Sequence, residues 1–288
     1  MKDKSIFLRH LLKSRLALGS IGVMVLLSVL ALFAPLIAPH DPYDLTAFSL
    51  TDRLLPPVFM ENGILSFPLG TDDQGRCIFS TICYGLRTSF LVGFGSIIAS
   101  MSVGMAFGLI SGYYGRWLDA IIGRLMDTIL SFPAFLVAVL LLGLLKQQGV
   151  IVLIIAISIC HWVRYARVMR GQVLGIREQE YVDAAKTLGA STPRIILHHV
   201  MPNAISPLFI IAAVDLGLII VQESTLSFLG IGVPLTMPSL GMMISSGYTF
   251  LFAGVWWPVL FPGAVLALLI LSVNIIGDWL RTELNPRN

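Results

Sequence analysis

The sequence predicts an all-α membrane protein that crosses the bilayer six times, with both termini in the cytoplasm. Of its 288 residues, 56% are hydrophobic and only 12% are charged, whereas a soluble domain carries about 25% charged residues. The apolar residues also gather into long runs, and about 20 helical residues cross the ~30 Å hydrocarbon core of a bilayer. A large, apolar soluble enzyme is therefore the less favoured class.

Six apolar runs are long enough, or nearly long enough, to be spans. The fourth run is short, so we expect its helix to continue into the polar stretch that follows. The first run resembles a signal peptide, but it is longer than the 7–15 residues of a cleavable apolar region, so we interpret it as a retained span. The runs are residues 16–38, 89–113, 125–145, 150–165, 204–221 and 255–280.

The orientation follows from the basic residues, which collect in cytoplasmic loops. With the N-terminus inside, 15 of the 19 Lys and Arg residues lie on the cytoplasmic side. This orientation predicts cytoplasmic tails at residues 1–15 and 282–288, and a proline-broken external loop at residues 39–86. Residues 87–281 then form a core of five spans, with an internal loop at residues 166–203.

The internal loop contains a short amphipathic helix. Tyr181, Ala184, Ala185 and Leu188 follow the spacing i, i+3, i+4, i+7 and share one helical face. Gly189 suits the end of that helix, where a positive φ is favoured. Two small alanines on the apolar face allow close approach by a partner protein. The alternative is a helix that packs only under its own bundle.

Ionisable residues inside spans are costly and often functional. Asp127 lies at the cytoplasmic start of the third span, where it either has a function or simply reaches water. Asp215 lies near the middle of the fifth span and either faces a pore or a partner subunit, or forms an internal hydrogen bond. Gln222 and Glu223 follow on the same span, so the three could line one polar stripe.

Motifs of enzymes and cofactor proteins are absent from the sequence. No GxxxxGK[ST], HExxH or nucleophile elbow occurs, and no basic stripe with aromatics suggests nucleic acid. Cys77, Cys83 and Cys160 lack the spacing of a metal or redox site. We therefore expect no catalytic residues, no metal and no cofactor. Cys77 and Cys83 could pair in an oxidising compartment, although two ordinary thiols are the favoured interpretation.

The internal loop resembles the EAA loop of ABC-importer permeases. Asp183, Ala184 and Ala185, then Gly189 and Pro202, match its order EAA, G and P, with Asp183 in place of Glu. His199 and Met201 replace the Ile and Leu of that pattern. In this family the helix docks into a cleft on the ATP-binding subunit.

Further motifs resemble the dipeptide, oligopeptide and nickel branch of these permeases, from the first span to the last residues. One element departs at Cys77, where Asp is usual, and another at Asn285, which precedes Pro286. A third departs at Leu240, where Trp often precedes Gly241. The matching segments are 69–72 with 75–76, 85–89, 127 with 131–133, 226–232, and 274–281.

The resemblance implies half of a translocation pore in the inner membrane of a prokaryote. It also implies a second homologous permease, two ATP-binding subunits that hydrolyse ATP, and an external substrate-binding protein. The implied substrate is a short peptide or, alternatively, nickel or a metal chelate. A rival interpretation is an autonomous secondary transporter with Asp215 as an ion-coupling residue, or a membrane-embedded enzyme. Six spans without a duplicated half argue against the first, and the lack of clustered catalytic groups argues against the second.

Overall fold

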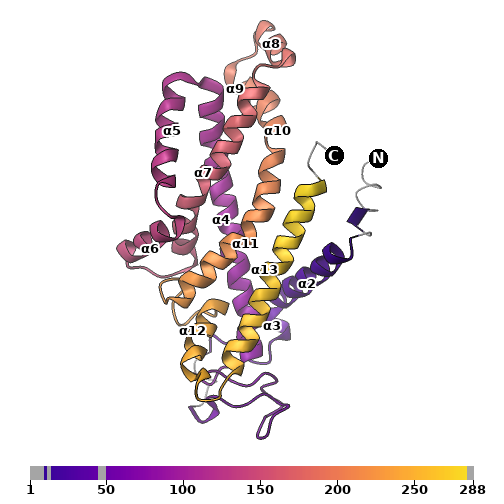
Figure 1. Cartoon of the computed structure of the whole chain (residues 1–288), viewed down its shortest axis with the longest axis vertical. Helices are drawn as coiled ribbons and strands as arrows, with labels where there is room; N and C mark the ends of the chain where they lie inside the picture. Colours follow the sequence, from indigo (N-terminus) through magenta and orange to yellow (C-terminus); the bar gives the residue numbers. More distant parts are fainter. Residues whose placement is uncertain (1–9, 12–13, 45–49, 284–288) are drawn as a thin grey trace.

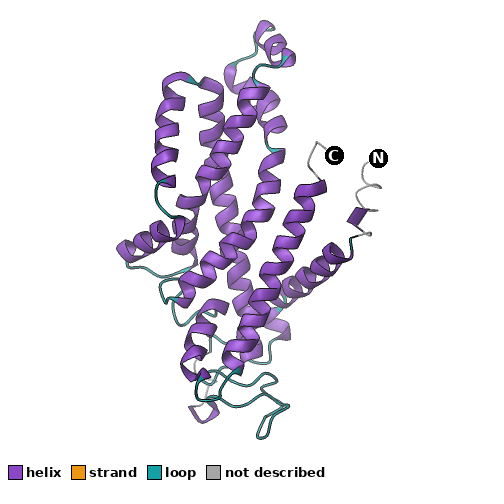
Figure 2. Cartoon of the chain, in the orientation of Figure 1, coloured by secondary structure: helices purple, strands orange, loops and turns teal. Residues whose placement is uncertain are grey.

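The computed structural model describes residues 10–11, 14–44 and 50–283, and the regular elements in this part of the chain are helices (Figure 2). The predicted tails lie largely outside the described residues, as do Asn285 and Pro286. Five helices are long and apolar enough to cross a membrane: α2 (Arg15–Leu32), α4 (Ile78–Tyr114), α7 (Val150–Ile176), α11 (Ser206–Phe228) and α13 (Trp257–Glu283). The all-α class is confirmed, and so is the continuation of the fourth span, since α7 runs on to Ile176.

The predicted third span is a broken one. Its residues fall in α5 (Arg116–Leu130) and α6 (Ala134–Leu145), which are bent by 87° relative to each other. Pro133 lies at the break, because proline has no N–H to continue the helix and disfavours helical backbone in the residue before it. The described residues therefore contain five helices that could span a membrane, or six spans if this bent pair counts as one.

Short helices connect or flank the spans. Near the first span and the loop after it are α3 (Ala34–Ile37) and a 3₁₀ turn, η1 (Leu50–Asp52). The internal loop holds α8 (Glu180–Thr187), α9 (Thr192–Ile195), the π-helical segment η2 (Ile196–Val200) and α10 (Met201–Ala204). A further helix, α12 (Leu240–Leu251), precedes α13. At 12 residues α12 is about 18 Å long, too short to cross a bilayer.

The two ends of the bundle are distinct (Figure 1). One end carries α8, and both described ends of the chain point toward it. The opposite end carries α12 and the folded loop of residues 50–77. This arrangement agrees with the predicted topology, whereas the assignment of each end to a side of the cell stays a prediction.

The core of the bundle is the pair α4 and α7, which pack at backbone distance. A Cβ added to Gly104 would lie 2.5 Å from the Trp162 carbonyl oxygen, and one on Gly108 would lie 2.6 Å from that of Ala166. Small residues let membrane helices approach this closely. At 37 residues, α4 is about 55 Å long and extends well beyond a ~30 Å core. It begins at Ile78, earlier than the predicted start of the second span.

The predicted external loop is folded onto the bundle. The indole N–H of Trp257 on α13 donates to the Thr71 carbonyl at 3.3 Å. Asp72 and Arg76 form a buried ion pair of 2.7 Å, with both side chains 3% exposed. Cys77, Cys83 and Cys160 are all buried free thiols, so the thiol interpretation holds and the disulfide alternative is wrong for this structure.

Candidate functional site

The α8 helix projects beyond the spans at one end of the molecule (Figure 1). Its inner face is formed by Val182 and Ala185, which are 0% and 8% exposed. These two side chains pack in one hydrophobic cluster with Ile195 of α9 and with Met169 and Val173 of α7. The helix is thus packed against α9, and the hydrophobic cluster that they share extends to the long helix α7.

The outer face of α8 is open to solvent in the single chain. Leu188 is 88% exposed and Tyr181 is 44% exposed, and Ala184 is also exposed. The four residues predicted to share one face therefore divide, since Ala185 turns toward the bundle. Val182, not Tyr181, pairs with Ala185 at i, i+3 on the inner face. Three exposed residues remain for a partner.

The end of α8 is a Schellman motif built on Gly189. The Gly189 N–H donates to the Lys186 carbonyl at 3.0 Å, and the Ala190 N–H donates to the Ala185 carbonyl at 3.1 Å. Gly189 has a φ of +79°, a conformation that glycine adopts without the steric cost borne by other residues. A Cβ there would meet no atom within 4 Å, so the requirement for glycine comes from the backbone alone.

Charges on α8 lie on its exposed surface. Asp183 accepts a hydrogen bond of 2.8 Å from Lys186, and this bond raises the pKa of Lys186. An exposed pair of this kind adds little stability. Asp183 therefore remains available to a partner protein.

Pro202 lies directly after a stretch of π-helix. The Met201 N–H donates to the Ile196 carbonyl, five residues back. Pro202 has no N–H to donate, and a widened turn before it accommodates the missing α-helical bond. Pro202 is exposed on α10, at the point where the internal loop leads into α11.

Three arginines on α7 each pair with an acidic residue of a neighbouring helix. Arg170 holds Asp119 of α5 through two bonds of 2.6 and 2.7 Å. Arg167 donates to Asp127 of α5 at 2.6 Å. Arg164 donates to Asp215 of α11. These pairs connect α7, which leads directly to α8, with helices on both of its sides.

The predicted polar residues are distributed between two places. Asp127 is largely exposed, with 61% of its side chain accessible, although Arg167 contacts it. Asp215 is fully buried and Gln222 lies near it in sequence on α11, with Gln222 Oε1 2.9 Å from His161 Nε2 of α7. Asp215 and Gln222 therefore share the seam between α7 and α11.

Glu223 does not belong to that seam, so the prediction of a single stripe is wrong. Its side chain is fully buried, and its carboxylate accepts four hydroxyl hydrogen bonds. The reason is helical geometry, because Glu223 is turned by about 100° from Gln222. The four donors are Ser227 at 2.9 Å, Ser89 at 3.0 Å, Ser239 at 3.1 Å and Ser224 at 3.2 Å.

Sequence reasoning missed the arginines, because it counted them only as cytoplasmic charges that set the orientation. Two signals could have identified Arg164. A carboxylate in mid-span, such as Asp215, requires a cation or donors. Arg164, Arg167 and Arg170 also follow at i, i+3, i+6, directly after the apolar part of the fourth span.

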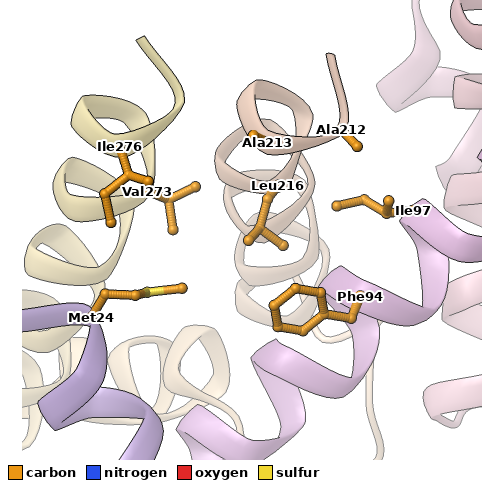
Figure 3. A pocket seen from close by; sticks show the side chains of 8 residues that line it. All are labelled: Met24, Phe94, Ile97, Ala212, Ala213, Leu216, Val273 and Ile276. Atoms are coloured by element: carbon orange, nitrogen blue, oxygen red, sulfur yellow. The ribbon is translucent and has the colours of Figure 1, made fainter. Parts of the chain in front are cut away.

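A separate cavity of about 270 Å³ lies on another face of α11 (Figure 3). Its lining comes from α2, α4, α11 and α13 and consists of apolar side chains. Such a lining offers no group that could orient a polar substrate. Its residues are Met24, Phe94, Ile97, Ala212, Ala213, Leu216, Val273 and Ile276.

Metal ligands do not gather in the described residues, where no group of three or more His, Cys, Asp or Glu side chains could hold an ion. His161, His198 and His199 lie in α7 and η2, and only His161 contacts the polar seam. The candidate residues that the structure does bring together therefore form an exposed short helix and a polar seam.

Known proteins similar to this chain fall in one class. A family described as the inner membrane component of binding-protein-dependent transport systems matches residues 104–288. The N-terminal transmembrane domain of oligopeptide transport permease C matches residues 5–57.

Individual relatives cover nearly the whole chain. The dipeptide transport system permease protein DppC of Alkalihalophilus pseudofirmus is 36% identical over 97% of this chain and 88% of its own length. The di/tripeptide permease protein DppC of Pseudomonas aeruginosa is 36% identical over 94% of this chain and 88% of its length. The oligopeptide permease protein OppC of Bacillus subtilis is 34% identical over 95% of this chain and 86% of its length.

Solved structures share the fold. An inward-facing methionine ABC transporter matches with a TM-score of 0.53 and 16% identity, over 71% of this chain and 97% of the other. An amino acid ABC transporter matches with a TM-score of 0.51 and 14% identity, over 71% and 94%. At these identities the likeness shows the fold alone. The chain has an exposed helix after α7 and a polar seam between α7 and α11, and the DppC relative of Alkalihalophilus pseudofirmus is 36% identical over 97% of this chain. The chain therefore belongs to the family of inner membrane components of binding-protein-dependent transport systems.

Proposed function

We propose that this chain is a permease subunit of an ABC importer and forms half of the pore through which short peptides enter the cytoplasm. The relatives named as dipeptide, di/tripeptide and oligopeptide permeases support peptides over the nickel alternative. The observation that carries the proposal is the exposed outer face of α8, formed by Tyr181, Ala184 and Leu188. An apolar face of this kind at the end of a membrane bundle fits a protein partner.

The partners in this proposal are a second homologous permease, two ATP-binding subunits and an external substrate-binding protein. Membership of the family supports such an assembly. The chain itself carries no GxxxxGK[ST] motif, so ATP is hydrolysed on the partner subunits. The complex lies in the inner membrane of a prokaryotic cell, with α8 on the cytoplasmic side.

Force passes from α8 to the pore through packed side chains. An ATP-binding subunit docked on Leu188 moves α8. Val182 and Ala185 then transmit the movement to α9 and to the hydrophobic cluster that α9 shares with α7. The Arg164–Asp215 pair then links α7 to α11. Coupling between distant sites requires such a contiguous and rigid connection. In this mechanism the chain performs no covalent chemistry.

Uptake measurements in cells test the substrate class. We expect deletion of the gene to abolish uptake of labelled dipeptides, and the plasmid-borne gene to restore it. Uptake of ⁶³Ni²⁺ measured in the same cells is the control for the alternative substrate. Unchanged peptide uptake together with loss of nickel uptake would overturn the peptide assignment.

A further inference from the structure

The Arg164–Asp215 pair lies deep within the spans. Asp215 is nine residues from the start of α11, about 14 Å along the helix, and Arg164 is fourteen residues from the start of α7, about 21 Å. The guanidinium contacts the carboxylate directly, so Arg164 is held at this depth and does not extend to the membrane surface. Asp215 is fully buried, whereas 51% of the Arg164 side chain is exposed in the single chain.

A half-exposed arginine side chain at this depth does not face lipid, where a charged group is costly. It faces either water or protein. The neighbouring polar residues His161 and Gln222 lie on the same seam. The apolar cavity of Figure 3 is lined by Ala213 and Leu216 of α11 and by none of the seam residues. The seam is thus one polar surface of the bundle, beside a second between α5 and α7 that includes Asp127 and Arg170. In a half-pore, a polar surface at the depth of Asp215 borders the translocation path.

The guanidinium has bonding capacity to spare. Arginine carries five N–H donors, and one hydrogen bond joins Arg164 to Asp215. Carboxylates are the acceptors that match the planar guanidinium best. Peptides with different side chains have a C-terminal carboxylate in common, so a pore for many peptides can recognise that group.

We propose that Arg164 determines specificity by binding the C-terminal carboxylate of a peptide as it passes through the pore. Asp215 is a positioning residue that fixes the guanidinium and partly neutralises it. A transport path must bind its substrate strongly enough for entry and weakly enough for release, and the paired carboxylate supplies this weakening. The inference rests on the proposed function, since it requires that the substrate is a peptide.

The test uses the complete transporter reconstituted in proteoliposomes with its binding protein. Uptake of a labelled dipeptide is compared with uptake of its C-terminal amide, each at concentrations that saturate the binding protein in separate titrations. We expect the wild type to transport the free acid about tenfold faster than the amide, because a charge-assisted bond is lost with the amide. Arg164→Gln should transport both at the slow rate, and Arg164→Lys should regain most of the preference. Arg167→Gln, an exposed arginine paired on the α5 side, is the matched control and should keep it.

The other outcomes distinguish the carboxylate site from the proposed function and from a structural role. Equal uptake of acid and amide by the wild type would overturn the carboxylate site while leaving peptide import intact. No uptake of either peptide by the wild type would overturn the proposed function itself. If Arg164→Gln and Arg164→Lys both assemble but both lose uptake of the acid and the amide, the Arg164–Asp215 pair has a purely structural role. The binding protein could fail to bind the amide, or Arg164→Gln could fail to assemble. In either case the KM of Arg164→Lys for the free acid is the deciding measurement. An unchanged KM with normal assembly would contradict the site, and a raised KM would support it.

Discussion

The carboxylate of Glu223 on α11 accepts a hydrogen bond of 3.0 Å from the hydroxyl of Ser89 on α4. Ser239, at the start of α12, donates to the other oxygen of the same carboxylate at 3.1 Å. One fully buried side chain thus connects three helices near the end of the bundle opposite α8. Since all four donors are neutral hydroxyls, the Glu223 carboxylate is a hydrogen-bond acceptor here and not a member of an ion pair.

Glu223→Gln should therefore be tolerated and Glu223→Ala should not. The glutamine amide retains an acceptor oxygen, and the serine hydroxyls can rotate to accept from its NH₂ group. Alanine leaves four buried hydroxyls without their shared partner, and each unsatisfied group costs about 1–3 kcal/mol. We expect a clearly lower Tm for Glu223→Ala in detergent and a nearly unchanged Tm for Glu223→Gln. Normal stability but no transport in Glu223→Gln would show that the charge itself is needed.

The contact between α4 and α7 predicts a graded effect at glycines. Gly108→Ala places a Cβ 2.6 Å from the backbone oxygen of Ala166, so the two helices must separate. Gly171→Ala on α7 meets no atom within 4 Å and should be neutral or slightly stabilising, since alanine favours helix by about 1 kcal/mol. Thermal unfolding of the two purified variants compares them. Equal Tm values would contradict the close helix contact.

Gly189 predicts a series that depends on backbone conformation rather than on size. Asparagine tolerates a positive φ. Alanine at a positive φ destabilises the turn by about 1–2 kcal/mol, and a β-branched valine destabilises it more. Because a side chain at Gly189 would meet nothing within 4 Å, the membrane core should remain intact in all variants. Peptide imported per ATP hydrolysed should then fall in the order Gly, Asn, Ala, Val. An equal ratio in all four proteins would show that the turn after α8 plays no part in coupling.

Hydropathy located the apolar runs, but it could not show where a helix bends or where it begins. Run length alone made residues 125–145 one span, whereas Pro133 divides them between α5 and α6. The start of α4 was missed because residues 78–88 include serines and threonines, which are buried in the structure. The short helix α12 lies below the length that identifies a span.

The site shows a similar limit. Periodicity predicted the α8 helix and its glycine end, yet Ala184 and Ala185 are adjacent and equally small. Only the packing of α8 against α9 decides that Ala185 is buried. The partners of Asp215 and Glu223 come from other helices, so the sequence could mark these residues as costly without showing what satisfies them.

Docking of an ATP-binding subunit on α8 is the central claim, and Leu188 and Ala185 separate it from simple packing. Leu188 is 88% exposed and Ala185 is 8% exposed. Leu188→Asp should leave the amount and the Tm of this chain unchanged, because the side chain touches little in the single chain. Ala185→Leu should instead lower the Tm, since overpacking costs about 1–3 kcal/mol.

Affinity purification of the tagged chain in mild detergent, with the bound ATP-binding subunits quantified, is the most direct measurement. We predict that the wild type retains these subunits and that Leu188→Asp loses most of them while the second permease stays bound. Full retention of the ATP-binding subunits by Leu188→Asp would contradict the claim that the outer face of α8 is the docking surface.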